Sequence, residues 1–109
     1  MKSNLYSYLY KLNKEGKAPF NMNSNDISYG DESYYEQNVT FEFKIGDNSY
    51  IVGWYSVTED REDWAQAENY NGDIFIKNGK NVSQSEIFND INNYIQIERE
   101  TKLNKLIND

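Results

Sequence analysis

The sequence predicts a single α+β domain: a small three-stranded antiparallel sheet with an N-terminal and a C-terminal helix packed on one face. Its 109 residues are the size of one domain. The centre of the chain alternates apolar and polar residues, as half-buried strands do, and both ends carry apolar residues at helical spacing. We therefore expect one domain, 1–109, with a helix in 1–17, the sheet in 38–77 and a second helix in 83–108.

The N-terminal helix is predicted from one apolar stripe. Leu5, Leu9 and Leu12 recur at steps of four and three residues, which places them on one helix face. Ser3 is a candidate N-cap, because its hydroxyl can accept a hydrogen bond from a backbone N–H of the first turn. Gly16 follows as a stop signal.

The next segment, 20–37, is rich in Asn, Ser, Asp and Tyr and has no usable periodicity. Such composition favours a loop, and loops of this length tend to be functional or disordered. Tyr34 and Tyr35 are candidates for the start of an edge strand.

The sheet is predicted from a hairpin and one further strand. Residues 39–45 alternate without a slip, which places Glu42 and Lys44 on the wet face. Turn-forming residues then lead into a returning strand at 50–57. Gly53 inside that strand indicates a bulge or a close approach by another backbone.

The third strand is expected at 73–77, followed by the tight-turn pair Asn78-Gly79. Between the second and third strands lies an acidic insertion, 58–72. Thr58 or Asp60 could cap a short helix there, and a loop is the alternative.

The C-terminal helix begins with a capping box. The Ser83 hydroxyl and the Glu86 carboxylate, three residues apart, can each satisfy the other's backbone amide. Ile87 and Ile91 begin the stripe that follows. Two alternatives stay open: one long helix that projects past the sheet, or a break near Thr101.

Charge is concentrated in the middle of the chain. Residues 26–73 hold twelve acids and two bases, so the whole net charge of −7 comes from this block. Six of the ten tyrosines and both tryptophans lie in it as well. Carboxylates interleaved with aromatic rings are suited to the recognition of a cationic partner.

Several classes of function are disfavoured. The chain has no cysteine and no histidine, which removes thiolate metal sites, disulfides and the side chain most used in acid–base catalysis. Neither 26–36 nor 60–73 has the alternating oxygen ligands of a calcium loop. Direct binding to nucleic acid needs Lys and Arg, of which the block has two against twelve acids, so its net negative charge would repel DNA. We therefore predict no enzyme activity, catalytic residue, cofactor or metal.

We favour the hypothesis of a stoichiometric inhibitor that mimics nucleic acid and occupies the basic channel of a nucleic-acid enzyme. The expected partner is thus a basic protein, bound by a monomer or weak dimer. The predicted partner-binding residues are Asp31, Glu32, Tyr34, Tyr35, Glu36, Glu59, Asp60, Glu62, Asp63, Trp64, Glu68 and Tyr70. The alternative is that the acids only keep a small protein soluble.

The order of these features resembles small acidic phage-encoded anti-defence proteins, in particular anti-CRISPR proteins that block the DNA-binding groove of a Cas nuclease. The resemblance rests on a short helix, the 39–57 hairpin, the acid run from Glu59 to Glu68 and a final helix rich in Ile and Asn. It is one of architecture and charge, and it implies inhibition of a host defence enzyme.

Two other functions remain as alternatives: an immunity or antitoxin-like protein with one basic cognate partner, or a structural adaptor of a phage or plasmid. No run of apolar residues is long enough to cross a membrane, and the N-terminus lacks the apolar core of a signal peptide. Abundant Asn, Ile, Lys and Tyr fit a low-GC bacterium or its mobile elements. We expect a protein of the bacterial cytoplasm.

Overall fold

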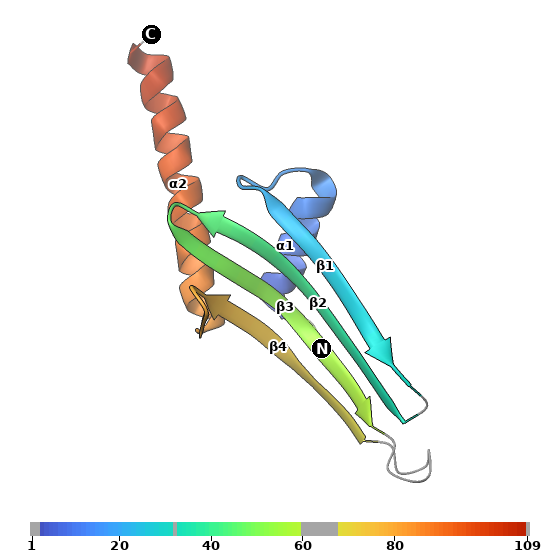
Figure 1. The fold of residues 1–109 in the computed structure, drawn as a ribbon. Coiled ribbons are helices and arrows are strands. Elements are labelled where there is room, and N and C mark those ends of the chain that lie inside the picture. Colours follow the sequence, from blue (N-terminus) through green and yellow to red (C-terminus); the bar gives the residue numbers. More distant parts are fainter. Residues whose placement is uncertain (1–2, 32, 60–67, 109) are drawn as a thin grey trace.

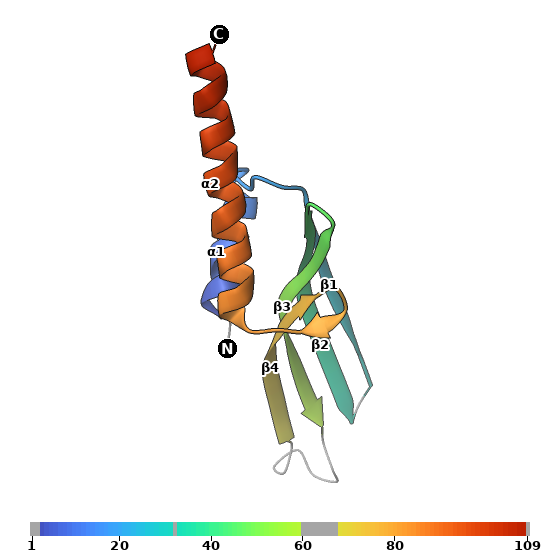
Figure 2. The same cartoon turned by 90° about the vertical axis from the view of Figure 1, so that its left-hand side faces the viewer.

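The computed structural model describes residues 3–31, 33–59 and 68–108. The chain folds into an antiparallel sheet with both helices on one face (Figure 1, Figure 2). The sheet follows chain order, with each strand beside the next. The described elements are α1 Asn4–Glu15, β1 Met22–Gly30, β2 Tyr34–Ile45, β3 Asn48–Glu59, β4 Glu68–Lys77, β5 Lys80–Asn81 and α2 Gln84–Asn108.

The α+β class and the two terminal helices are confirmed, but the prediction of three strands is wrong: the described sheet has five. One extra strand, β1, lies in the segment predicted to be a loop. It pairs with β2 without interruption, from Met22 opposite Phe43 to Gly30 opposite Tyr35. Met22 is half-buried and the other β1 residues are exposed, so this strand forms without the apolar alternation that marks a buried face.

The remaining strands are longer than predicted. β2 begins at Tyr34 rather than Val39, and β4 begins at Glu68 rather than Asp73. Each extension pairs with a neighbouring strand, which satisfies its backbone groups although its side chains are polar. Residues 60–67, for which a short helix was one prediction, lie outside the described residues.

The predicted N-caps Ser3 and Ser83 and the predicted stop at Gly16 are confirmed. Of the predicted capping box, the hydrogen bond to Ser83 forms, and the Glu86 carboxylate lies 3.6 Å from the Lys77 Nζ. The Ser3 hydroxyl accepts the N–H three residues later at 3.1 Å, and the Ser83 hydroxyl does the same at 3.2 Å. Gly16 ends α1 in the left-handed conformation, with φ of 67°. α2 continues past Thr101 without a break, and its C-terminal part projects beyond the sheet (Figure 1).

The core lies between the helices and one half of the sheet. We call residues 22–26, 39–45, 48–54 and 73–77 the proximal half, which the helices cover, and residues 27–30, 34–38, 55–59 and 68–72 the distal half, which projects beyond them (Figure 1, Figure 2). The buried core residues are Leu5, Tyr6, Leu9, Phe41, Phe43, Tyr50, Val52, Ile87 and Ile91. All four that come from strands belong to the proximal half.

Gly53 lies where two strands of the proximal half come very close. Its pairing with Thr40 is regular, so the predicted close approach is confirmed and the alternative of a bulge is wrong. A Cβ atom at this position would lie 2.0 Å from the Val39 carbonyl oxygen, nearer than any side chain can come. Only glycine fits here.

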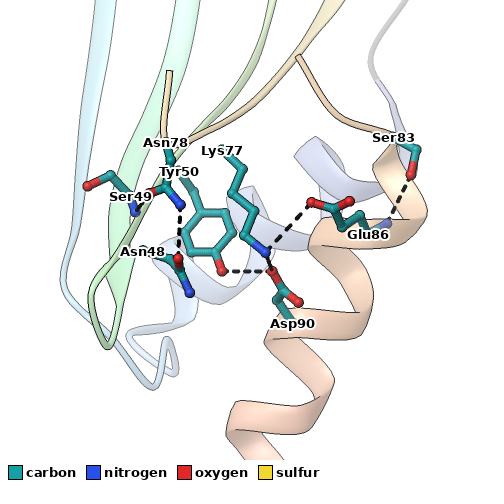
Figure 3. Close-up of polar contacts among 8 residues, drawn as sticks. All are labelled: Asn48, Ser49, Tyr50, Lys77, Asn78, Ser83, Glu86 and Asp90. Carbon is teal, nitrogen blue, oxygen red and sulfur yellow. Dashed lines mark hydrogen bonds and ion pairs between the residues drawn. The ribbon is translucent and has the colours of Figure 1, made fainter. Parts of the chain in front are cut away.

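A polar cluster ties α2 to the sheet (Figure 3). The Lys77 Nζ lies 2.7 Å from Asp90 Oδ2 and 3.6 Å from Glu86 Oε2. The Tyr50 hydroxyl donates to the same Asp90 oxygen at 2.8 Å. The hydrogen bond to Asp90 raises the pKa of Lys77, so the pair stays ionised near neutral pH. These contacts set the position of α2 over β3 and β4.

Candidate functional site

The distal half of the sheet carries acidic side chains without a basic one. Residues 27–38, 55–59 and 68–72 contain five carboxylates and no Lys or Arg. Lysines lie instead on α1, at Lys11 and Lys14, just after it, at Lys17, and on the proximal strands, at Lys44 and Lys77. Charge is therefore separated along the molecule, which has extents of 70 × 25 × 20 Å.

The fold gathers most of the predicted partner-binding residues at this end (Figure 1). Those that lie in the distal half or in the turn between β1 and β2 are Asp31, Tyr34, Tyr35, Glu36, Glu59, Glu68 and Tyr70. The others, Glu32, Asp60, Glu62, Asp63 and Trp64, lie outside the described residues.

The register places these positions in two rows across three strands. Tyr34, Glu59 and Glu68 are direct neighbours on β2, β3 and β4. Glu36 and Tyr70 belong to the next row on the same face, with one β3 residue between them. Because adjacent strands are about 4.8 Å apart, the rows form one compact acidic and aromatic surface. We call it the distal face; it is the face that the helices do not cover.

Glu36 is held by three hydrogen bonds on this face. Tyr29 donates to Oε2, Tyr34 donates to the same oxygen at 2.9 Å, and the Asn38 amide donates to Oε1 at 3.1 Å. The hydrogen bond from Tyr29, and to a lesser extent the other two, lowers the pKa of Glu36. The bond between Tyr29 and Glu36 also raises the pKa of Tyr29 to about 12. At neutral pH the carboxylate is ionised, both tyrosines are neutral, and the group presents a fixed negative charge framed by rings.

Asp31 shapes the turn that ends β1. Its Oδ1 accepts hydrogen bonds from the Ser33 N–H at 2.8 Å, the Ser33 hydroxyl at 3.1 Å and the Tyr34 N–H at 3.0 Å. The bonds from Ser33 lower the pKa of Asp31. This carboxylate therefore has a structural task as well as a place at the acidic end.

The distal face also exposes large apolar side chains that sequence reasoning missed. Ile27 and Tyr29 are 59% and 55% exposed, and Tyr70, which was predicted, is 47% exposed. Ile27 and Tyr29 belong to the segment predicted as a loop, where only the register with β2 assigns them to a face. Tyr35, also predicted, is 48% exposed but lies on the opposite face, because alternate residues of a strand point to opposite sides.

The described side chains of the distal face include carboxylates, amides and aromatic rings. Within 3–31, 33–59 and 68–108 no three metal-ligating side chains gather as a metal site requires. A carboxylate that acts as a general acid needs a raised pKa, whereas the pKa of Glu36 is lowered. A fixed negative charge beside exposed rings can attract a cationic group.

No protein-family model, curated protein or solved structure matches this chain. Neither of the two helices described has the length and apolar character that crossing a membrane requires.

Proposed function

We propose that the protein is a stoichiometric inhibitor whose distal face binds the basic nucleic-acid channel of an enzyme, as a mimic of nucleic acid. The observation that carries this proposal is the convergence of Tyr34, Glu36, Glu59 and Tyr70 on one face at the end of the molecule farthest from the α1 lysines. A host defence enzyme, such as a Cas nuclease, is the class of target that the acidic phage-protein format suggests.

The geometry supports access to a recessed target. The distal strands extend past both helices, so nothing in the described fold stands beside them (Figure 2). Glu36 and Glu59 lie on adjacent strands, so their charges add to one field, and that field attracts a basic surface before contact. Exposed Tyr29 and Tyr70 are aromatic anchors of the kind that dominate interface energetics.

The test is competition with DNA, using a charge-reversed variant and a matched control. Glu59→Lys/Glu68→Lys reverses two positions of the distal face. Glu42→Lys/Asp47→Lys makes the same charge change at two exposed positions away from the distal half, one in β2 and one in the turn between β2 and β3. Tagged wild-type and variant proteins would be incubated with a lysate of a low-GC bacterium at low and high salt, with and without excess duplex DNA.

We expect wild type and the Glu42/Asp47 variant to capture the same nucleic-acid enzyme, which DNA displaces and salt weakens, and the Glu59/Glu68 variant to lose it. The captured enzyme should then be inhibited at one-to-one stoichiometry. A partner that binds tightly and is indifferent to DNA would replace the proposal with an immunity-type function. Equal capture by both variants would exclude the distal face as the binding site.

A further inference from the structure

A second candidate surface lies at the opposite edge of the fold from β4 and β5. β1 is the outermost described strand on that side of the sheet, and eight of its nine residues are exposed. Edge strands are usually protected from pairing by charged residues, above all lysine, or by proline, and β1 contains no lysine, no proline and a single charged residue, Asp26. It is therefore open to a further strand.

The hydrogen-bond pattern shows which β1 backbone groups are available. The Asp31 N–H donates to the Tyr34 carbonyl at 2.7 Å, and the register from there to Met22 is uninterrupted. In an antiparallel pair, alternate residues direct both backbone groups toward the partner strand. Every second residue of β1 therefore bonds to β2, and those between them, Ser24, Asp26 and Ser28, direct N–H and C=O outward.

A groove of about 330 Å³ runs beside this edge, between β1 and α1. Three aromatic rings connect the groove to the core. Tyr10, which is 52% exposed, stacks on Tyr6 with ring centroids 6.4 Å apart, and Tyr6 stacks on buried Phe41 with centroids 5.3 Å apart. The carboxylate of Asp26 lines the same groove, with Oδ1 accepting a hydrogen bond from the Gln37 amide at 3.1 Å.

We propose that this edge and groove bind an extended peptide segment of a partner protein, which adds a strand to β1 and places a Lys or Arg side chain opposite Asp26. Directly opposed residues of neighbouring strands share a face, so the side chain opposite Asp26 enters the groove. Its apolar stem lies along the Tyr10 ring and its charged head reaches the Asp26 carboxylate. Backbone hydrogen bonds to β1 provide the affinity, and the Asp26 carboxylate provides the specificity for a basic residue.

Charge selects a basic peptide over a second copy of the chain. If β1 paired antiparallel with itself about its midpoint, Asp26 would face Asp26 of the other copy, and like charges directly opposed destabilise a strand pair. The net charge of −7 also opposes self-association and favours a cationic segment. The site is separate from the distal face and does not depend on the function proposed for it.

The probe is the peptide acetyl-STVKVTS-amide, titrated into the full-length protein and followed by amide NMR and hydrogen exchange. Its control is the same peptide with Glu in place of Lys. We expect the Lys peptide to bind and to slow exchange of the Ser24, Asp26 and Ser28 amides, and the Glu peptide to bind more weakly.

Three variants test the assignment. Asp26→Asn, which keeps the shape of the side chain, should weaken binding of the Lys peptide about three- to fivefold. Ser28→Pro removes one outward N–H without touching the β1–β2 bonds and should weaken both peptides about fivefold or more. Asp73→Asn is the matched control, since Asp73 lies in the register row of Asp26 at the far side of the sheet. It should leave binding unchanged.

Four results would overturn the proposal: no binding of the Lys peptide, equal binding of the Glu peptide, equal effects of the two Asp→Asn variants, or protection of β1 amides that rises with protein concentration in the absence of peptide. The last would identify a second copy as the occupant. Glu59→Lys/Glu68→Lys should bind the peptide as wild type does, so failure at one surface is distinguishable from failure at the other.

Discussion

The proximal and distal halves of the sheet are formed by the same four strands, yet only the proximal half has a core. It supplies Phe41, Phe43, Tyr50 and Val52 to the space under the helices. In the described part of the distal half no residue is buried. The strands continue from one half to the other without a break in pairing.

This difference shows that the distal strands are held by their backbone ladders and by cross-strand side-chain pairs. Such pairs contribute modestly to stability, about 0.2–1 kcal/mol each. The aromatic side chains of the distal half, such as Tyr29 and Tyr70, therefore fill no core and are about half exposed to solvent. Mutations should accordingly divide into those that unfold the protein and those that change only its surface.

The largest contrast is expected from truncating one aliphatic side chain of the core under the proximal half and one of the distal half. Leu9→Ala removes a side chain that is 0% exposed from the core and should lower the free energy of unfolding by about 3 kcal/mol. Ile27→Ala, in the distal half, should change it by less than about 0.5 kcal/mol. Urea denaturation followed by circular dichroism measures both. Similar losses would mean that the distal half is an integral part of the core.

A smaller contrast is expected from two strand glycines. Gly53→Ala places a methyl group against the Val39 carbonyl, a backbone atom that cannot move away, and should destabilise the fold by about 2 kcal/mol. Gly72→Ala meets the Tyr55 ring instead, at 2.5 Å from its hydroxyl, and a ring at the distal half can swing aside. We expect a clearly smaller loss for Gly72→Ala in the same denaturation assay. The reverse order would show that the distal strands are the more rigid.

The smallest contrast between the halves is expected in how the melting temperature depends on one carboxylate of each as the pH falls. Burial alone would raise the pKa of Asp90, but hydrogen bonds from Lys77 and Tyr50 outweigh it and lower the pKa below its ordinary value of 3.8. A lowered folded-state pKa stabilises the protein above 3.8, and this stabilisation is lost as the pH falls through the folded-state value. The difference in melting temperature between wild type and Asp90→Asn should therefore shrink below pH 3.8.

Glu36→Gln is the variant of the distal half to compare with Asp90→Asn. Hydrogen bonds, chiefly from Tyr29, lower the pKa of Glu36 below 4.5, so its contribution has the same sign and fades below pH 4.5. Its effect on melting should be the smaller of the two, because water screens an exposed group. An effect larger than that of Asp90→Asn would contradict the view that the distal face contributes little to stability.

The sequence was sufficient for the elements whose signals are local. Ser3, Gly16 and Ser83 end or begin helices through contacts within one turn, and residues 39–45 alternate because one of their faces is buried. β1 escaped prediction because its pattern is set by pairing with β2 and by no burial of its own. The extension of β4 to Glu68 has the same cause.

The candidate site likewise has residues that the sequence identified and residues that depend on strand register. Composition identified the acids and several tyrosines of the distal face, because charge is visible without coordinates. The Tyr29–Glu36 contact and the exposure of Ile27 depend on which residue of β1 lies opposite which residue of β2. The sequence contains no local signal for that register.

Because carboxylates lie at the distal end and lysines on α1, the charge distribution has a dipole component between these two regions. In the field of a basic surface the molecule experiences a torque that turns the distal end forward and the α1 lysines away. Productive docking is normally slowed because two patches must meet in one orientation, and this alignment removes part of that search before contact. The benefit should fall as salt shortens the Debye length to about 10 Å at 0.1 M, well below the 70 Å length of the molecule.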